Sequence, residues 1–132
     1  MPVYVESITQ PSAQDRSDLA KIYADAPAWL LEPHASAEAL IEAALTDGSL
    51  IAGRFNDRLL GAALLRRGDG TWHLSHLCVR KLTRKRGVGR RLLEESQRLA
   101  GAAGKPLHLA APPDHLEARA LAARTHLPLD PL

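Results

Sequence analysis

The chain contains 132 residues, of which 45% are hydrophobic and 24% are charged, so it has the size and composition of one small globular domain. Its one cysteine, Cys78, excludes an intramolecular disulfide framework and is typical of a reducing compartment, and the absence of a signal-peptide pattern or long apolar run disfavours secretion and membrane insertion. Residues 80–91 hold seven cations and no acid, whereas the other 120 residues carry 10 cations and 15 acids, so the net charge of +2 hides a cationic island. We therefore expect a single cytoplasmic domain over residues 1–132 with one concentrated anion-binding site.

The N-terminal third of the chain predicts one strand and two helices. Val3–Ile8 alternates weakly between apolar and polar residues, which is typical of a strand. Ser12 begins the sequence S-A-Q-D, which is close to a capping box and predicts a helix over Ala13–Ala24. A second helix is expected over Ala37–Leu45, with Ser36 as its N-cap.

Three strand signals separated by turns follow in the middle of the chain. We expect strands over Ser49–Phe55, Leu59–Arg66 and Trp72–Val79, because each run is rich in apolar residues and bounded by turn residues. Asn56-Asp57 forms a two-residue turn between the first two strands, and Gly68-Asp69-Gly70 forms the next turn. This arrangement predicts an antiparallel meander.

The C-terminal half predicts a helix, a short strand and a last helix. Val88–Ala100 has an apolar stripe at helical spacing, Leu107–Ala110 reads as a strand, and Pro113 fits the first turn of a helix that ends near Arg124. The complete order, β-α-α-β-β-β-α-β-α, predicts an α/β fold with a mixed sheet. The cationic island lies at a strand-to-helix junction of a βαβ crossover, where open α/β sheets tend to bind ligands.

The sequence R-K-R-G-V-G at residues 84–89 leads directly into the predicted helix. The first N–H groups of a helix lack partners within the helix and lie at the positive end of its dipole. Gly87 and Gly89 carry no side chain, so a phosphate can approach this backbone closely, and the surrounding Arg and Lys side chains add charge-assisted hydrogen bonds. We interpret the segment as a pyrophosphate site; the alternative is a solvated basic turn. Nucleic acid is a less favoured ligand because the cations are confined to one loop.

These residues resemble a known superfamily. R-K-R-G-V-G matches the R/Q-x-x-G-x-G/A signature of GNAT acetyltransferases, and three blocks, Ser12–Tyr23, Ala52–Leu60 and Val79–Glu95, resemble the PanZ (PanM) family of acetyl-CoA-dependent maturation factors for aspartate α-decarboxylase, PanD. The resemblance implies the GNAT fold, an α/β fold with a mixed, mostly antiparallel sheet flanked by helices. The chain ends in P-L-D-P-L soon after the last predicted helix, so we expect the C-terminal strand pair of that fold to be reduced or missing.

The resemblance also implies a binding site for acetyl-CoA or CoA. The strand backbone at Leu77, Cys78 and Val79 would lie beside the pantetheine arm. The residues implied to wrap the pyrophosphate are Thr83, Arg84, Lys85, Arg86, Gly87, Val88, Gly89 and Arg90. The charge and the glycines at the helix start indicate the pyrophosphate residues independently of the resemblance. The pantetheine residues depend on the resemblance alone.

The usual catalytic groups of the superfamily have no obvious counterparts in this sequence. Its tyrosines are Tyr4 and Tyr23, far from the last helix that carries the usual acid, and the strand W-H-L-S-H-L-C-V contains no carboxylate to act as base. His76 is the candidate replacement base, or else His73, and their spacing of three places them on opposite faces of a regular strand. Cys78 is expected to pack and not to act as a nucleophile. The six histidines show no metal-ligand spacing, so no metal site is expected.

These features favour a protein that senses acetyl-CoA over an efficient enzyme. By resemblance, it would promote self-cleavage of the PanD precursor, restrain the mature decarboxylase, and so regulate pantothenate and CoA biosynthesis. The candidate surface for this partner is the hairpin sequence R-F-N, formed by Arg54, Phe55 and Asn56, for which an ordinary turn is an equally good interpretation. The alternative function is an active N-acetyltransferase with His76 as its base.

Overall fold

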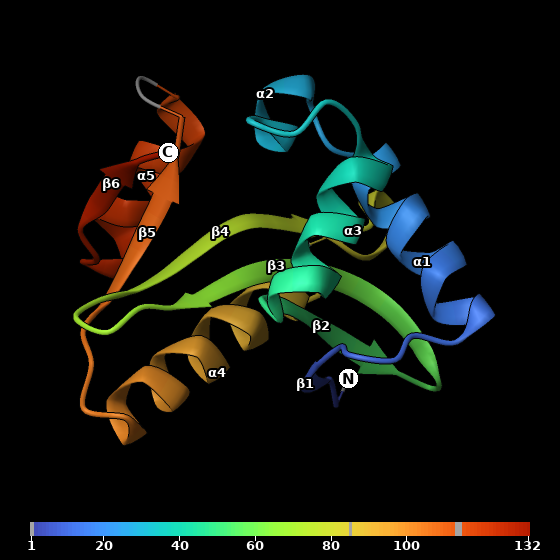
Figure 1. Ribbon diagram of the computed structural model, residues 1–132, viewed down its shortest axis with the longest axis horizontal. Helices are drawn as coiled ribbons and strands as arrows, with labels where there is room; N and C mark the ends of the chain where they lie inside the picture. Colours follow the sequence, from blue (N-terminus) through green and yellow to red (C-terminus); the bar gives the residue numbers. More distant parts are fainter. Residues whose placement is uncertain (1, 85, 113–114) are drawn as a thin grey trace.

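Six strands form one mixed sheet in the part of the chain that the computed structural model describes, residues 2–84, 86–112 and 115–132 (Figure 1). They lie side by side in chain order: β1 (Tyr4–Ser7), β2 (Leu50–Phe55), β3 (Arg58–Arg67), β4 (Trp72–Val79), β5 (Leu107–Ala111) and β6 (Leu129–Pro131). The strands β1 to β4 pair with one another in antiparallel fashion, whereas the pairs β4–β5 and β5–β6 are parallel. The expected meander is confirmed, and the three-residue strand β6 is an element that the sequence analysis missed.

Helices cover both faces of this sheet. They are α1 (Ala13–Ala24), α2 (Ala28–Leu31), α3 (Ala37–Asp47), the short 3₁₀ turn Lys81–Thr83, α4 (Val88–Ala102) and α5 (Leu116–Thr125). In Figure 1, α1 and α3 lie on one face and α4 on the other, and each face has its own apolar core. The short helix α2 was not expected, and the expected helix start at Pro113 lies outside the described residues. Within the described ranges, no helix has the length and apolar character that crossing a bilayer requires.

Capping and turn residues set several element boundaries as the sequence predicts. Ser12 accepts a hydrogen bond from the backbone N–H of Asp15, whose carboxylate accepts one from the Ser12 N–H, and this capping box starts α1. Ser36 caps α3 in the same position. Asn56 and Asp57 both have positive φ, 48° and 64°, which is the backbone of a two-residue hairpin turn between β2 and β3.

Two glycines allow the first turn of α4 to lie directly on the sheet. Gly53 of β2 and Gly61 of β3 are register partners, and a Cβ atom at Gly61 would lie only 2.8 Å from Val88 Cγ1. Val88 is the first residue of α4 and is 1% exposed. The packing of its side chain against bare backbone therefore fixes the start of α4 relative to the sheet.

A bulge interrupts β4 at His76. The register with β3 shifts by one residue here, and His76 has a φ of 55°. Leu74 and Leu77 consequently both pack against the core beneath α4, whereas Cys78 packs into the core beneath α1 and α3. The expectation that His73 and His76 face opposite sides of the sheet is wrong, because it assumed an unbroken alternation that the bulge removes.

Candidate functional site

A large cavity opens where β4 and β5 separate. The two strands pair only over Trp72–Leu74 and Leu107–Leu109, and beyond these residues they diverge (Figure 1). The cavity between them has a volume of about 1010 Å³, and residues of α2, α4 and α5 complete its walls. Leu77, Cys78 and Val79 all line it, so the structure brings these three residues to one wall of an open and largely apolar cleft.

A second cavity, of about 620 Å³, lies at the N-terminus of α4. Its lining contains the expected pyrophosphate residues that the structure describes, which are Thr83, Arg84, Arg86, Gly87, Val88, Gly89 and Arg90. The remaining expected residue, Lys85, lies outside the described residues. The two cavities share lining residues, among them Val79, Gly89 and Arg90, so an apolar cleft continues into a cationic one.

The backbone at the start of α4 is open to solvent beside two glycines. Gly87 is the N-cap residue and has a φ of 86°, which an L-side chain would adopt only under strain. The N–H groups of the first turn point away from the helix body, as at every helix start, and carry the positive end of the dipole. A Cβ atom at Gly89 would make only an ordinary contact, 3.6 Å from Val79 Cγ2, so the protein leaves the space beside this residue open.

Arg84 holds the cationic loop against the end of β4. Its Nε donates a hydrogen bond to the carbonyl oxygen of Val79 at 3.2 Å, and its guanidinium also reaches the carbonyl oxygen of Asp25 at 3.4 Å. The Asp25 carboxylate in turn accepts a hydrogen bond from the backbone N–H of Lys81 at 3.0 Å. The loop is thus tied both to β4 and to the C-terminal end of α1, and this arrangement positions it beside the helix start.

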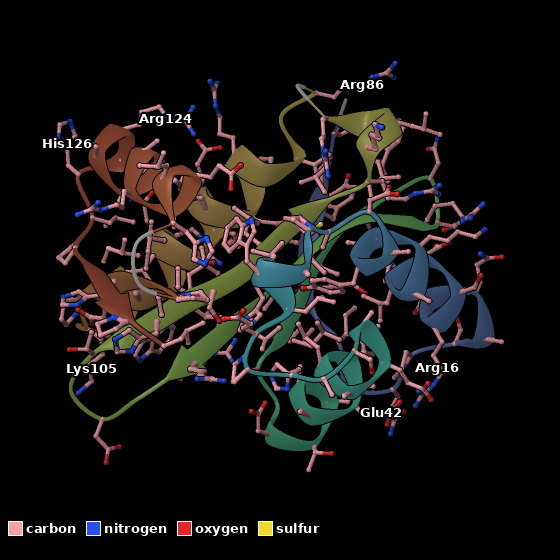
Figure 2. All side chains as sticks on the ribbon, turned by 90° about the horizontal axis from the view of Figure 1, so that it is seen from above. Arg16, Glu42, Arg86, Lys105, Arg124 and His126 are labelled. Carbon is pink, nitrogen blue, oxygen red and sulfur yellow. The ribbon has the colours of Figure 1, made fainter. Side chains whose placement is uncertain are left out.

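Arg124 lines both cavities and is a candidate site residue that the sequence analysis did not identify. It lies on α5 and is exposed. In Figure 2, Arg86 and Arg124 both project from the same edge of the molecule. No local motif marks Arg124, because its place beside the α4 N-terminus depends on how α5 packs on the sheet.

His76 is buried, and both of its ring nitrogens are engaged. Nε2 lies 2.7 Å from the carbonyl oxygen of Glu32, which can only accept, so Nε2 carries the proton. Nδ1 therefore accepts from the Ser75 hydroxyl, also at 2.7 Å. Burial lowers the pKa of His76, and the neutral ring fits this arrangement. These hydrogen bonds give His76 a structural role, because they anchor the segment after α2 to the bulge of β4.

Cys78 is held inside the protein rather than presented as a reactive thiolate. It is 5% exposed, and its Sγ donates a hydrogen bond to the carbonyl oxygen of Ile22 at 3.3 Å. Burial raises the pKa of the Cys78 thiol, which keeps it protonated at neutral pH.

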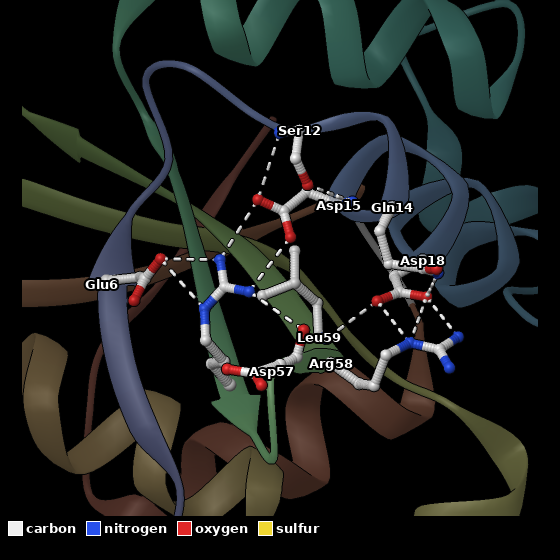
Figure 3. Close-up of polar contacts among 9 residues, drawn as sticks. Glu6, Ser12, Gln14, Asp15, Asp18, Asp57, Arg58 and Leu59 are labelled. Atoms are coloured by element: carbon white, nitrogen blue, oxygen red, sulfur yellow. Dashed lines mark hydrogen bonds and ion pairs between the residues drawn. The ribbon is translucent and has the colours of Figure 1, made fainter.

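The three hairpin residues of the R-F-N sequence differ in how far their side chains are exposed and free to contact a partner. Arg54 is engaged internally, with its guanidinium bound to the carboxylates of Glu6 and Asp15, whose surroundings appear in Figure 3. Phe55 is half-buried against the core beneath α4, and Asn56 is exposed at the turn. These residues do not line either of the cavities described above, so a partner at the hairpin would bind apart from them.

Comparison with known proteins places the sequence among GNAT domains. The family model described as an acetyltransferase (GNAT) domain, PanZ, matches residues 2–129. The PanD regulatory factor of Salmonella typhimurium is 40% identical over 84 residues, which are 64% of this chain and 58% of that protein. A mycothiol acetyltransferase of Clavibacter michiganensis subsp. michiganensis is 45% identical over 78 residues, which are 59% of this chain and 24% of that protein. The chain thus spans less than two thirds of the length of these curated relatives.

The fold comparison agrees. The PaiA N-acetyltransferase of Thermoplasma acidophilum, solved in complex with coenzyme A, has a TM-score of 0.69 and 14% identity, over 95% of this chain and 89% of that chain. At that identity the likeness concerns the fold, a CoA-binding fold in this neighbour. The family model covers the described sheet from β1 to the first residue of β6, together with both cavities. The chain belongs to the PanZ family of GNAT acetyltransferase domains.

Proposed function

We propose that this chain binds acetyl-CoA or CoA in the cytoplasm and regulates PanD, by promoting self-cleavage of the precursor and restraining the mature decarboxylase. The observation that carries the proposal is the continuity of the apolar cleft with the cationic helix start. CoA fits both, because its long pantetheine arm can lie in the cleft while its compact pyrophosphate lies at the cationic helix start. The PanD regulatory factors among the relatives support PanD as the partner and a regulatory role. By the family resemblance, that role would lie in pantothenate and CoA biosynthesis.

The pyrophosphate would bind the N–H groups of the first turn of α4, with Arg86 and Arg90 at its rim. Both side chains are exposed and line the cationic cavity, so they can form charge-assisted hydrogen bonds with phosphate oxygens. The pantetheine arm would lie along β4 beyond Leu74. Pairing between β4 and β5 ends at this residue, which leaves that edge of β4 free of β5 and available to amide groups of a ligand.

Regulation requires that ligand and partner favour the same state of the protein. Bound CoA thioester would fix the loop that Arg84 ties to β4 and α1, and the ordered chain would bind PanD more tightly. By linkage, PanD must then tighten acetyl-CoA binding by the same factor.

An N-acetyltransferase is the second candidate function, favoured by the mycothiol acetyltransferases among the relatives. The required base would be His76, which lines the cavity. To accept a proton at Nδ1, however, the ring must give up its hydrogen bond from Ser75 and become charged in a buried position. These costs favour a sensing role over catalysis.

Two measurements test the proposal. Titration calorimetry with acetyl-CoA should show one site with micromolar or tighter affinity; the absence of binding would end both CoA-based functions. Unprocessed PanD mixed with the chain should then be cleaved faster with acetyl-CoA than without it, and an unchanged cleavage rate would remove the regulatory function. Release of free thiol from acetyl-CoA with a panel of amines, lost on His76→Ala, would favour the transferase instead.

A further inference from the structure

Three strands bring two histidines and an aspartate together at the C-terminal side of the sheet. His73 of β4 and His108 of β5 are direct register partners, because the two strands run parallel from Trp72 and Leu107. On the next strand, β6, Asp130 pairs with Ala110. The expectation of no metal site considered only spacing along the chain, in which His73 and His108 are 35 residues apart, and the sheet register removes that separation.

The three side chains meet at their polar atoms. His73 Nε2 lies 2.7 Å and His108 Nδ1 lies 2.8 Å from the same carboxylate oxygen of Asp130, and all three potential ligand atoms lie within 4.8 Å of one another. The side chains are only half-buried, with exposed fractions of 32% for His73, 26% for His108 and 40% for Asp130. An ion can therefore reach the cluster from solvent, and water can complete its coordination.

The cluster is separate from the CoA cavity. The neighbouring residues Leu74, Leu109 and Leu129 line that cavity, whereas His73, His108 and Asp130 do not. Alternation along the strands accounts for this, since consecutive side chains point to opposite faces of a sheet. Neither the proposed binding of CoA nor the proposed interaction with PanD makes use of these three residues.

We propose that His73, His108 and Asp130 bind a divalent transition-metal ion of the Zn²⁺ type, through His73 Nε2, His108 Nδ1 and an Asp130 carboxylate oxygen. Two imidazole nitrogens and one carboxylate are a donor set that suits Zn²⁺ and its neighbours and that is poor for Mg²⁺ or Ca²⁺. Three protein ligands leave at least one coordination position to water.

The geometry requires only a small adjustment. Metal–ligand bonds of about 2.1 Å in a tetrahedral site place ligand atoms roughly 3.4 Å apart, whereas the present hydrogen bonds hold Asp130 Oδ2 at 2.7 and 2.8 Å from the two ring nitrogens. The carboxylate must therefore withdraw by a fraction of an ångström, and each neutral ring must change tautomer, its proton moving by way of solvent to the other ring nitrogen, so that the ligating nitrogen is free to bind the ion. Because β6 has three residues and lies at the edge of the sheet, it can make this movement without disturbing the core.

Charge balance also bears on the site. Asp130 brings a carboxylate to the two ring nitrogens and so supplies the negative charge that attracts a cation. Arg66 is the register partner of His73 across the β3–β4 ladder and is exposed. Its positive charge would repel a bound cation. Removal of Asp130 would leave this opposing charge unbalanced, so we expect Asp130→Asn to weaken binding as much as the loss of a histidine.

To test the proposal, ZnCl₂ is added to the chain, prepared without an affinity tag, and binding is measured by calorimetry and by native mass spectrometry. MgCl₂ serves as the comparison, because Mg²⁺ is a hard cation that this donor set should not bind. The expected result is one Zn²⁺ per chain at micromolar or tighter affinity and no Mg²⁺ binding. His73→Gln, His108→Gln and Asp130→Asn should each weaken Zn²⁺ binding at least tenfold. His126→Asn is the matched control, since His126 is exposed after α5, projects outward (Figure 2) and has a positive φ that asparagine tolerates.

Nitrogen-detected NMR of the histidine rings makes the test independent of the variants. Zn²⁺ added to the unmodified chain should shift the ring nitrogens of His73 and His108 and leave those of His115 and His126 in place. The proposal is overturned by a chain that takes up no Zn²⁺, by Zn²⁺ binding that the three substitutions leave unchanged, or by ring shifts confined to other histidines.

Discussion

The Arg54 guanidinium donates hydrogen bonds to both carboxylate oxygens of Asp15, at 3.0 and 3.2 Å. This contact joins the end of β2 to the first turn of α1, and the same guanidinium also binds Glu6 of β1 at 2.9 Å (Figure 3). An arginine that the family resemblance suggested as a partner contact therefore also holds three elements of the fold together. A loss of PanD binding in an Arg54 variant would have to be separated from this structural effect.

Asp15→Asn should lower the free energy of unfolding by about 1–2 kcal/mol at neutral pH, because it removes a charge-assisted contact and weakens the capping box. Hydrogen bonding from Arg54 lowers the pKa of Asp15 in the folded chain. Its stabilisation is therefore complete above the unfolded-state pKa of about 3.9 and is lost as the pH falls through the lowered folded pKa. Denaturant unfolding at several pH values should show the difference between the two proteins shrink below about pH 4. A difference that stays constant with pH would contradict the assignment.

Gly87→Ala should destabilise the protein by about 1–2 kcal/mol, because it forces an L-residue into the left-handed region at φ 86°. Gly101→Ala is the matched control on the same helix. It has no positive φ and open space around the added methyl group, so it should stabilise the protein by about 0.5–1 kcal/mol. Thermal unfolding of both variants checks the pair, and equal shifts in Tm would show that the conformation of Gly87 carries no strain.

Gly89→Ala should leave both stability and ligand binding largely intact. The added Cβ makes only a 3.6 Å contact with Val79 and replaces glycine within a helix, so Tm should hold or rise slightly. The signature R/Q-x-x-G-x-G/A accepts alanine at this position and a methyl group leaves the N–H groups of the first turn in place, so acetyl-CoA affinity should change by less than about threefold. Calorimetry gives the affinity, and a tenfold loss would show that the pyrophosphate needs the space beside Gly89 to stay empty.

Arg124→Gln should weaken acetyl-CoA binding about three- to tenfold while leaving Tm unchanged, because the side chain is exposed and lines both cavities. Arg119→Gln removes the same charge from an exposed position on the same helix that lines neither cavity. Only the first substitution should change the affinity measured at constant ionic strength. Equal losses in both variants would indicate general attraction of charge rather than contact.

His76→Gln should reduce the dependence of stability on pH below about pH 6.5. Burial lowers the pKa of His76, so between that value and about 6.5 the unfolded chain binds more protons than the folded chain. The contribution of the neutral ring is therefore complete above about pH 6.5 and is lost as the pH falls below it. Denaturant unfolding at several pH values measures the slope, with His126→Asn as control. A slope unchanged by His76→Gln would mean that His76 titrates normally in the fold.

Local sequence patterns predicted most of the secondary structure, because the forces that set element ends act over a few residues. The capping box at Ser12 and the turn at Asn56-Asp57 each depend on neighbouring atoms and appear where the sequence predicts them. The start of α4 at Val88 follows from the glycines around it for the same reason. Two short elements, α2 and β6, escaped prediction because their few residues carry no periodic pattern; Leu30 and Leu31 of α2 and Leu129 of β6 pack against cores built by other elements.

The sequence by itself determined the chemistry of this protein: a cationic, glycine-containing helix start on an otherwise acidic chain, and the family that carries it. The tertiary structure alone decided which distant side chains meet. The divergence of β4 from β5 made the cavity, the packing of α5 brought Arg124 to it, and the bulge at His76 changed which faces of the sheet the β4 side chains occupy. The parallel register placed His73 beside His108. Such contacts depend on strand pairing and helix packing across the whole chain, so they leave no periodic or local signal in the sequence.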